Sequence, residues 1–243
     1  MTIPRLFLST PLAAGQMVEA DPGQGHYLNQ VLRRKPGDLV HLFNGADGEW
    51  EARIESGRKD KAVLELLRPL RAQATGPDMR LIIAAVKRDA MDWIVEKATE
   101  LGVSRIQPVT TARTITDRVN TARLANIARE AAEQCERLDV PAVAEPLPLF
   151  TLLDRWDGAP IYYGAAREDA QPLARALSGA RPPLAWLVGP EGGFTGPELD
   201  VLLRHPFLRP AGLGPRILRA ETAAVSGLVL LQSLCGDWQE TTV

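Results

Sequence analysis

The hydrophobic pattern of this chain changes its period once, and that change limits the folds available to it. Up to about residue 72, apolar and polar residues alternate in short runs such as 49–55, a period typical of half-buried strands. From residue 80 onward, apolar runs of strand length alternate with amphipathic segments of helix length. Because the two patterns belong to different architectures, we expect two domains, 1–72 and 79–243, joined by a Gly-Pro-containing linker at 73–78.

The first domain is expected to be a small β-barrel. Extended runs are predicted at 4–8, 16–20, 38–43, 49–55 and 61–67. A turn is predicted at 56–57, and one short helix at 25–34 with Leu28, Val31 and Leu32 on its apolar face. Short strands at this spacing, with one helix, favour a barrel.

The second domain is expected to be a mostly parallel α/β sheet. Strands are predicted at 80–86, 105–109, 161–164 and 184–188, and helices at 89–101, 121–135, 170–177, 197–203 and 221–234. This alternation is typical of a parallel sheet covered by helices. Asp89 is expected to cap the first helix, and the periodicity places Trp93 and Trp186 in the core.

Composition excludes several classes of protein. With 28 Lys and Arg against 30 Asp and Glu, the net charge of −2 argues against nucleic-acid binding by the whole surface, although local basic patches remain possible. Two cysteines cannot form a disulfide framework, and with three histidines we expect no metal site. No apolar run reaches the roughly 18 residues that span a bilayer, and no signal peptide is recognisable. We therefore expect a cytoplasmic protein that does not enter the membrane.

The strongest candidate for a ligand site is a glycine-rich loop after the apolar run 184–188. It reads Gly189-Pro190-Glu191-Gly192-Gly193-Phe194-Thr195. Ligands of open α/β sheets bind beyond the carboxyl ends of the strands, where small residues allow close approach to the backbone. A tight turn would need only one or two glycines, so three glycines around an acid favour a ligand loop. Thr195 and Glu198 predict a capping box on the next helix.

A second glycine-containing loop leads into the last helix. It reads Leu213-Gly214-Pro215-Arg216-Ile217-Leu218-Arg219, followed by Glu221 in the first helical turn. Free backbone N–H groups at a helix start can hold an anion or a polar ligand, and the two arginines are either part of such a site or solvated surface charges. Walker, dinucleotide-binding, nucleophile-elbow and zinc-protease motifs are absent from the sequence.

Basic residues form two short clusters, at 33–35 and at 87–88. They are either solvated surface charges or phosphate contacts. His26 and Tyr27 either stack on a base or, the favoured interpretation, pack against the barrel. The residues predicted to contact RNA are Arg5, Arg33, Arg34, Lys35, Lys87, Arg88, Arg113 and Arg137.

The two loops together resemble the ribosomal RNA small subunit methyltransferase E family, one of the knotted SPOUT methyltransferases. The likeness extends along essentially the whole chain, through Val31-Leu32-Arg33, Lys87-Arg88-Asp89, Lys97-Ala98-Thr99-Glu100-Leu101-Gly102 and Gln134-Cys135-Glu136-Arg137. The chain departs from the family pattern at Tyr27, where His is frequent, at Leu124, where Trp is frequent, and at Asp117, where a basic residue is common.

The resemblance implies a PUA-like barrel that helps to hold RNA and a C-terminal domain with a trefoil knot, in a homodimer. It implies methylation of N3 of one uridine in 16S rRNA on the assembled 30S subunit, with S-adenosylmethionine as donor. The residues that it assigns to the donor are Gly189, Pro190, Glu191, Gly192, Leu213, Gly214, Ile217, Leu218, Glu221, Thr222 and Ala223.

The implied reaction needs help in removing the N3 proton of uridine. Since neither glycine-containing loop holds a histidine, we expect a cation to stabilise the uridinate oxygens, Arg219 first and Arg216 second. Glu191 would bond the donor or orient an arginine. Two other classes stay open: a non-catalytic RNA- or ribosome-binding module with no donor affinity, and a small-molecule enzyme that turns over without RNA.

Overall fold

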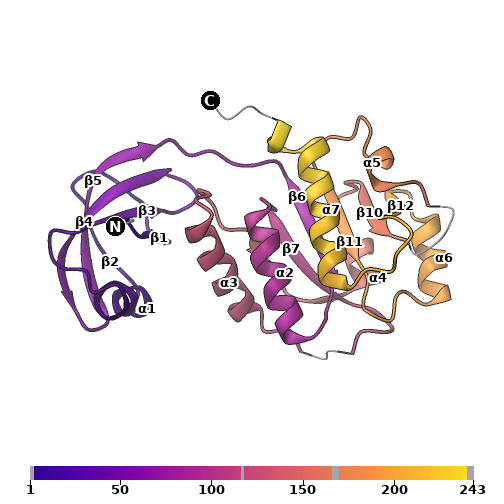
Figure 1. The fold of residues 1–243 in the computed structure, drawn as a ribbon, viewed down its shortest axis with the longest axis horizontal. Coiled ribbons are helices and arrows are strands. Elements are labelled where there is room, and N and C mark those ends of the chain that lie inside the picture. Colours follow the sequence, from indigo (N-terminus) through magenta and orange to yellow (C-terminus); the bar gives the residue numbers. More distant parts are fainter. Residues whose placement is uncertain (1–2, 116–117, 166–169, 240–243) are drawn as a thin grey trace. The chain divides into compact units, whose positions relative to one another are not determined.

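The computed structural model describes residues 3–115, 118–165 and 170–239, and the chain forms two compact units (Figure 1). The first unit contains Met1–Thr75 and Ala132–Val140, and the second contains Gly76–Ala131 and Pro141–Val243. The first unit therefore includes a segment from the middle of the chain, which no pattern in the sequence predicts.

The first unit is built on a five-stranded sheet in the order β1-β3-β4-β5-β2. Its strands are β1 (Arg5–Phe7), β2 (Met17–Glu19), β3 (Leu39–Phe43), β4 (Glu49–Arg58) and β5 (Lys61–Arg71). β1 pairs with β3 in parallel, and the other pairings are antiparallel. Alternate strand residues such as Leu42, Ile54 and Leu64 are buried and form the core of this unit.

The predicted turn at 56–57 is wrong, because β4 continues to Arg58. A shift of register between Ile54 and Ser56 absorbs the irregularity, so the hairpin turns at 59–60 instead. Gly57 is needed here for a different reason: a Cβ on it would lie 2.3 Å from the Asn29 side-chain oxygen.

The helical segment begins earlier than predicted and is divided into α1 (Pro22–His26) and a π-helix, η1 (Tyr27–Val31). α1 starts early because Asp21 and Gln24 form a capping box, with Pro22 in the first turn. η1 ends at Val31 with Leu32 as its C-cap, before Arg33 takes a left-handed conformation with φ 53°.

The outward face of this segment differs from the prediction. Leu28 is buried as predicted, but Val31 is 59% exposed. The Leu32 N–H donates to the Tyr27 carbonyl, and this wider π-turn rotates Val31 away from the core. The favoured interpretation of His26 and Tyr27 as packed side chains is also wrong, since both are exposed.

The second unit confirms the prediction of a parallel α/β fold. Its seven-stranded sheet has the order β12-β10-β11-β6-β7-β8, with β9 beside β7, and its described pairings are parallel. The strands are β6 (Met79–Ala84), β7 (Arg105–Thr110), β8 (Ala142–Val143), β9 (Leu147–Pro148), β10 (Ile161–Gly164), β11 (Leu184–Val188) and β12 (Leu208–Ala211).

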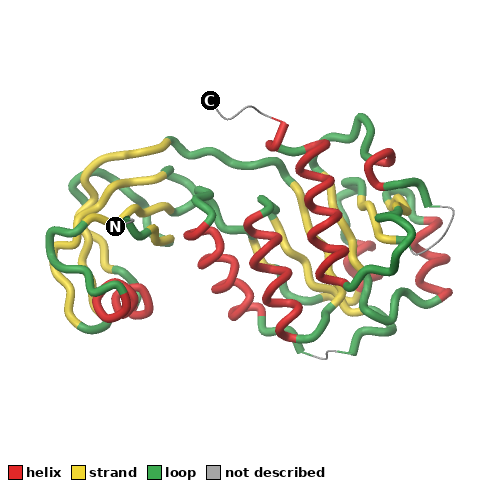
Figure 2. Tube along the Cα trace, viewed as in Figure 1, coloured by secondary structure: helices red, strands yellow, loops and turns green. Residues whose placement is uncertain are grey.

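Figure 2 distinguishes these strands from the helices that cover them. The helices are α2 (Arg88–Glu100), α3 (Thr121–Gln134), α4 (Leu149–Asp154), α5 (Leu173–Ala176), α6 (Gly196–Arg204), α7 (Ala220–Cys235) and the 3-10 turn η2 (Asp237–Gln239). The hydrophobic pattern does not predict β8, β9, β12 or α4, whose short lengths give too few residues to establish a period. Within the described ranges, every helix is too short or too polar to cross a bilayer.

Trp186 in β11 is fully buried in the second unit, as predicted. Helix α7 packs against β11 and lies beside α2 (Figure 1). The other predicted core tryptophan, Trp93, is 42% exposed on α2, so that prediction is wrong. The predicted cap of α2 is also wrong: Lys87 occupies the N-cap position, and Asp89 lies in the first turn, where the helix dipole favours its charge.

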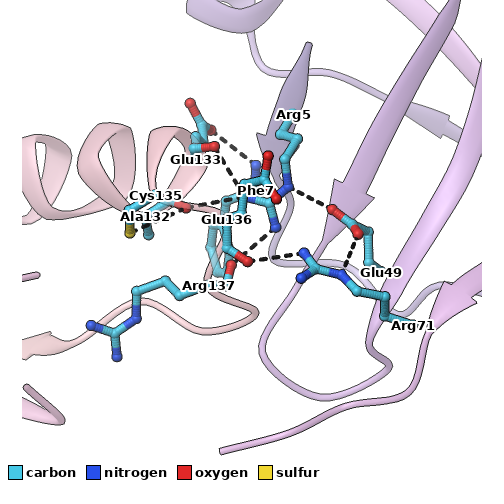
Figure 3. A network of polar contacts seen from close by, with 9 residues as sticks. All are labelled: Arg5, Phe7, Glu49, Arg71, Ala132, Glu133, Cys135, Glu136 and Arg137. Carbon is cyan, nitrogen blue, oxygen red and sulfur yellow. Dashed lines mark hydrogen bonds and ion pairs between the residues drawn. The ribbon is translucent and has the colours of Figure 1, made fainter. Parts of the chain in front are cut away.

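A buried carboxylate holds the middle-chain segment in the first unit (Figure 3). Glu49 is only 4% exposed, and its two oxygens lie 2.5 Å from Arg5 Nε and 2.6 Å from Arg71 Nε. Arg5 also donates to the carbonyls of Ala132, Glu133 and Arg137. Carbonyls at a helix C-terminus lack intrahelical donors and carry partial negative charge, so a buried cation stabilises the end of α3.

This network corrects two predicted RNA contacts. The Arg5 side chain is only 7% exposed and its donors are taken up by Glu49 and three carbonyls, so it is not available to phosphate. Arg137 is 13% exposed at its side chain and pairs with Asp139. Arg5 holds the segment 132–140 in place, whereas the ion pair of Arg137 with Asp139 lies within that segment.

The network makes the stability of the protein depend on pH. Burial raises the pKa of Glu49, but hydrogen bonds and charge from Arg71 and Arg5 outweigh it and lower the pKa below its usual value. A carboxylate with a lowered pKa stabilises the fold above its unfolded pKa, and that contribution is lost as the pH falls through the folded pKa.

We expect Glu49→Gln to lower the free energy of unfolding at pH 7 by about 2 kcal/mol, less than for a fully buried pair because Arg71 is 43% exposed. Urea denaturation at pH 7 and at pH 3.5 measures the effect, and the difference from wild type should shrink at the lower pH. Glu55→Gln is the control, since Glu55 pairs with Arg53 at the surface of the same strand. Equal losses for both variants, independent of pH, would contradict this account.

Candidate functional site

The two glycine-containing loops leave the same edge of the parallel sheet. The first, 189–195, follows β11, and the second, 212–219, follows β12. Both strands pair in parallel with β10, which lies between them, so their carboxyl ends share one edge. The turn at 111–114 follows β7 at that edge as well. Open α/β sheets bind their ligands at this position.

Glu198 ties the first loop to the turn after β7. It completes the predicted capping box with Thr195, whose backbone N–H and Oγ1 donate to Oε2 at 2.7 and 2.8 Å. Its other oxygen, Oε1, accepts the backbone N–H of Ala112 at 2.8 Å. Burial raises the pKa of Glu198, but these hydrogen bonds outweigh it and lower the pKa below its usual value. The capping motif predicts the hydrogen bonds between Thr195 and Glu198, whereas no sequence signal predicts the bond from Ala112 to Glu198.

Arg113 makes a second hydrogen-bonded contact between the turn after β7 and the first loop. Its Nη1 donates to the Gly192 carbonyl at 2.6 Å, and a Cβ on Gly192 would lie 3.3 Å from the Arg113 side chain. Arg113 is exposed, so its predicted role in RNA contact stays a prediction beside this structural one.

The first loop turns sharply at Pro190–Gly193. The Gly193 N–H donates to the Pro190 carbonyl at 2.8 Å, and Gly193 has a left-handed φ of 67° with open space beside its Cα. Pro190 is buried, whereas Glu191 and Gly192 are exposed. The loop therefore presents backbone and one carboxylate to solvent.

The second loop exposes its arginines. Arg216 and Arg219 are exposed, and Ile217 between them is 95% exposed. Arg219 is the N-cap of α7 but makes no side-chain cap, so the first-turn N–H groups of this helix have no side-chain acceptor from their N-cap. Glu221 lies in the first turn, as predicted.

One contact holds the start of α7 against β11, the strand that leads into the first loop. The indole Nε1 of Trp186, shortly before the first loop, donates to the Ala223 carbonyl at 3.0 Å. The Ala223 N–H in turn donates to the Arg219 carbonyl at 2.8 Å, at the end of the second loop. Gly227 permits this approach, because a Cβ there would lie 2.2 Å from the indole. The helix that follows the second loop is therefore packed against the strand that precedes the first loop.

The predicted RNA contacts are divided between the two units. Arg33, Arg34 and Lys35 belong to the first unit, and Lys87, Arg88 and Arg113 to the second. All of them are exposed except Arg34, which is half-buried. Of the departures from the family pattern, Leu124 is buried in α3, and Asp117 lies outside the described residues.

The two loops and the start of α7 suit a ligand with polar edges and a reaction in which negative charge develops on the substrate. Backbone groups of both loops and the start of α7 can hold such edges, and two exposed arginines can face the charge. Among residues 3–115, 118–165 and 170–239, no three His, Cys, Asp or Glu side chains gather as a metal site.

Comparison with known proteins matches both units. Residues 74–232 match the model of an RNA methyltransferase domain, and residues 20–67 that of an RNA methyltransferase PUA domain. The chain is 32% identical to ribosomal RNA small subunit methyltransferase E of Rickettsia conorii, over 97% of this chain and 98% of that protein. It is 30% identical to the Bacillus subtilis protein of the same name, over 84% of each.

Two similar solved structures cover 98% of this chain and 100% of their own. One is a Legionella pneumophila protein described as a putative methyltransferase in complex with S-adenosylmethionine, 29% identical with a TM-score of 0.88. The other is ribosomal RNA small subunit methyltransferase E of Neisseria gonorrhoeae bound to S-adenosylmethionine, 31% identical with a TM-score of 0.87. With both units matched in order, the chain belongs to the ribosomal RNA small subunit methyltransferase E family, which its two glycine-containing loops resemble.

Proposed function

We propose that the protein transfers a methyl group from S-adenosylmethionine to N3 of a specific uridine in 16S rRNA, within the assembled 30S subunit. The observation that carries the proposal is that both glycine-containing loops leave one edge of the parallel sheet, where the Trp186–Ala223 hydrogen bond holds the start of α7 against β11. Family membership supplies the reaction class, and two relatives bind S-adenosylmethionine. The target atom and the 30S context come from the family resemblance.

The loops fit the proposed cofactor. Gly193 and Gly214 have left-handed φ angles of 67° and 102°, and open space lies beside the Cα of each. A nucleoside can therefore approach both backbones closely, and α7 adds N–H groups without a side-chain cap. The proposed cofactor residues are Gly189, Pro190, Glu191, Gly192, Leu213, Gly214, Ile217, Leu218, Glu221, Thr222 and Ala223.

The chain's own contribution to the reaction is electrostatic. When bound, S-adenosylmethionine supplies an electrophilic methyl group. Uridine N3 becomes nucleophilic as its proton passes to solvent water, and negative charge then develops on the neighbouring oxygens. The Arg219 guanidinium and the positive end of the α7 dipole stabilise that charge, with Arg216 as the second cation and Glu191 orienting an arginine or bonding the donor.

The proposal includes a homodimer, a cytoplasmic location and a trefoil knot in the second unit. These features come from the family resemblance. The strand order is compatible with a knot, since the chain passes from β11 to β12 across the intervening β10. For RNA contact, the proposed set is now Arg33, Arg34, Lys35, Lys87, Arg88 and Arg113.

We expect Arg219→Ala to lower the single-turnover rate of methyl transfer at least tenfold, about 1.4 kcal/mol in the barrier, because the developing uridinate loses its cation. Calorimetry should give a largely unchanged affinity for S-adenosylmethionine. The substrate is small subunits from a strain lacking this methyltransferase, and Arg204→Ala, at the exposed end of α6, is the control. A rate equal to that of wild type would refute the role of Arg219.

We expect wild-type protein to add one methyl group per 16S rRNA as 3-methyluridine, because the proposed site activates a base nitrogen. Mass spectrometry of digested rRNA, before and after reaction, identifies the product. A methyl on the ribose or on another base atom would overturn the N3 assignment. Tight RNA binding with no affinity for S-adenosylmethionine would instead favour a non-catalytic module.

We expect Glu198→Gln to weaken S-adenosylmethionine binding about tenfold, since an amide cannot accept all the hydrogen bonds that hold the first loop. Calorimetry measures the affinity, and circular dichroism checks that the variant is folded, because Glu198 is buried near the start of α6. Asp200→Asn, an exposed change on the same helix, is the control. Unaltered affinity in both variants would exclude this positioning role.

A further inference from the structure

The aromatic ring of Phe194 folds back against the beginning of the loop that carries it. A Cβ on Gly189 would lie 3.0 Å from two carbon atoms of that ring, Cε2 and Cζ, and 3.4 Å from Cδ2. The segment 190–193 lies between the two residues and contains the exposed Glu191 and Gly192. The contact between Gly189 and Phe194 therefore closes this segment into a short loop at its base.

The neighbours of the Phe194 ring leave it little room to move away from Gly189. The residue is 9% exposed and belongs to a core cluster that also contains Tyr163 and Leu202. Tyr163, in β10, contacts the ring edge to face, with 6.5 Å between the ring centroids and an interplanar angle of 84°. The ring is therefore fixed between the strand that precedes the loop and the strand beside it.

The backbone is held on both sides of Phe194 as well. Before it, the Gly193 N–H donates to the Pro190 carbonyl at 2.8 Å. After it, the Thr195 N–H donates to Glu198 Oε2 at 2.7 Å. Since the ring and its backbone are both held, a methyl group at position 189 would push the loop out of its conformation.

A loop of this composition needs an anchor of this kind. Glycine loses more conformational freedom on ordering than any other residue, and the segment 189–196 contains four glycines. A ligand held by the backbone of such a loop binds more tightly when the loop is ordered beforehand. Because the Phe194 ring is buried, its effect on a ligand passes through the loop backbone.

We propose that Phe194 is a positioning residue for S-adenosylmethionine: its ring closes the first loop on Gly189 and holds the loop backbone in the conformation that binds the cofactor. Position 189 is then glycine because of the ring, rather than because the cofactor approaches it closely. The inference rests on the proposed assignment of the first loop to the cofactor, and it does not depend on which atom of the rRNA is methylated.

An exchange of side-chain size between the two positions tests the inference. In full-length protein, Gly189→Ala and Phe194→Leu should each weaken S-adenosylmethionine binding, measured by calorimetry, on the order of tenfold, because each disturbs the loop. Leucine lacks the two ring atoms nearest to Gly189, so it leaves room for the added methyl group. The double variant should therefore lose only about tenfold, whereas independent effects would multiply to about a hundredfold.

Two control variants separate this contact from an added methyl group and from a weakened core. Gly196→Ala places its methyl group in open space at the start of α6, directly after the loop, and should bind the cofactor as wild type does. Leu153→Ala removes a buried side chain of α4 from the core cluster of Phe194. It should lower the Tm and leave the affinity of the folded protein unchanged.

Steady-state kinetics add a measurement that a merely structural role would not alter. With small subunits from a strain lacking this methyltransferase as substrate, Phe194→Leu should raise the KM for S-adenosylmethionine on the order of tenfold. Its kcat should stay within about twofold of wild type, because the variant loses cofactor binding rather than stabilisation of the transition state. A fall in kcat with an unchanged KM would contradict the positioning role.

Multiplied losses in a folded double variant would overturn the inference, and so would equal affinities of Gly189→Ala and Gly196→Ala. The second comparison leaves Phe194 unchanged, so it decides the question if Phe194→Leu does not fold. A protein that shows the expected coupling but methylates an atom other than N3 of uridine refutes the proposed function alone. A protein that methylates N3 while the double variant loses a hundredfold in affinity refutes the role of Phe194 alone.

Discussion

The approach of α7 to β11 is the constraint on which the candidate site depends. Trp186 fills the space between strand and helix, its N–H holds the Ala223 carbonyl, and Gly227 lets the helix backbone reach the ring. Because α7 begins where the second loop ends, this one packing contact also places Arg219 beside the carboxyl edge of the sheet. A core contact thus determines where a solvent-exposed arginine can act.

Polar contacts of the second unit hold the first loop in position, in addition to the packing of α7 on β11. Glu198 and Arg113 connect the first loop to the turn after β7, whereas Trp186 holds α7, the helix that follows the second loop. The glycines between these ties have left-handed angles or close neighbours that larger side chains would not tolerate. The first loop is therefore held at its middle by Arg113 and at its end by Glu198, while open space lies beside Gly193 and Gly214.

The sequence predicts those parts of the fold that depend on local patterns. The parallel sheet, the capping box of Thr195 and Glu198 and the burial of Trp186 follow from periodicity or from a short motif. Two features depend on residues distant in sequence: the hydrogen bond from Ala112 to Glu198 and the burial of Arg5. The exposure of Tyr27 accompanies the wider turn of the π-helix η1. No local pattern encodes these features, so the sequence predicts the charged side chain of Arg5 at the surface, in contact with RNA.

The capture of 132–140 by the first unit has a consequence for how the chain is made. Arg5 and Glu49 emerge from the ribosome long before Arg137, whose carbonyl Arg5 binds. Until then, the guanidinium groups around Glu49 lack the carbonyls that they hold in the finished protein. The N-terminal unit therefore cannot complete its folding as an early, independent step of synthesis, and must wait for more than half of the chain.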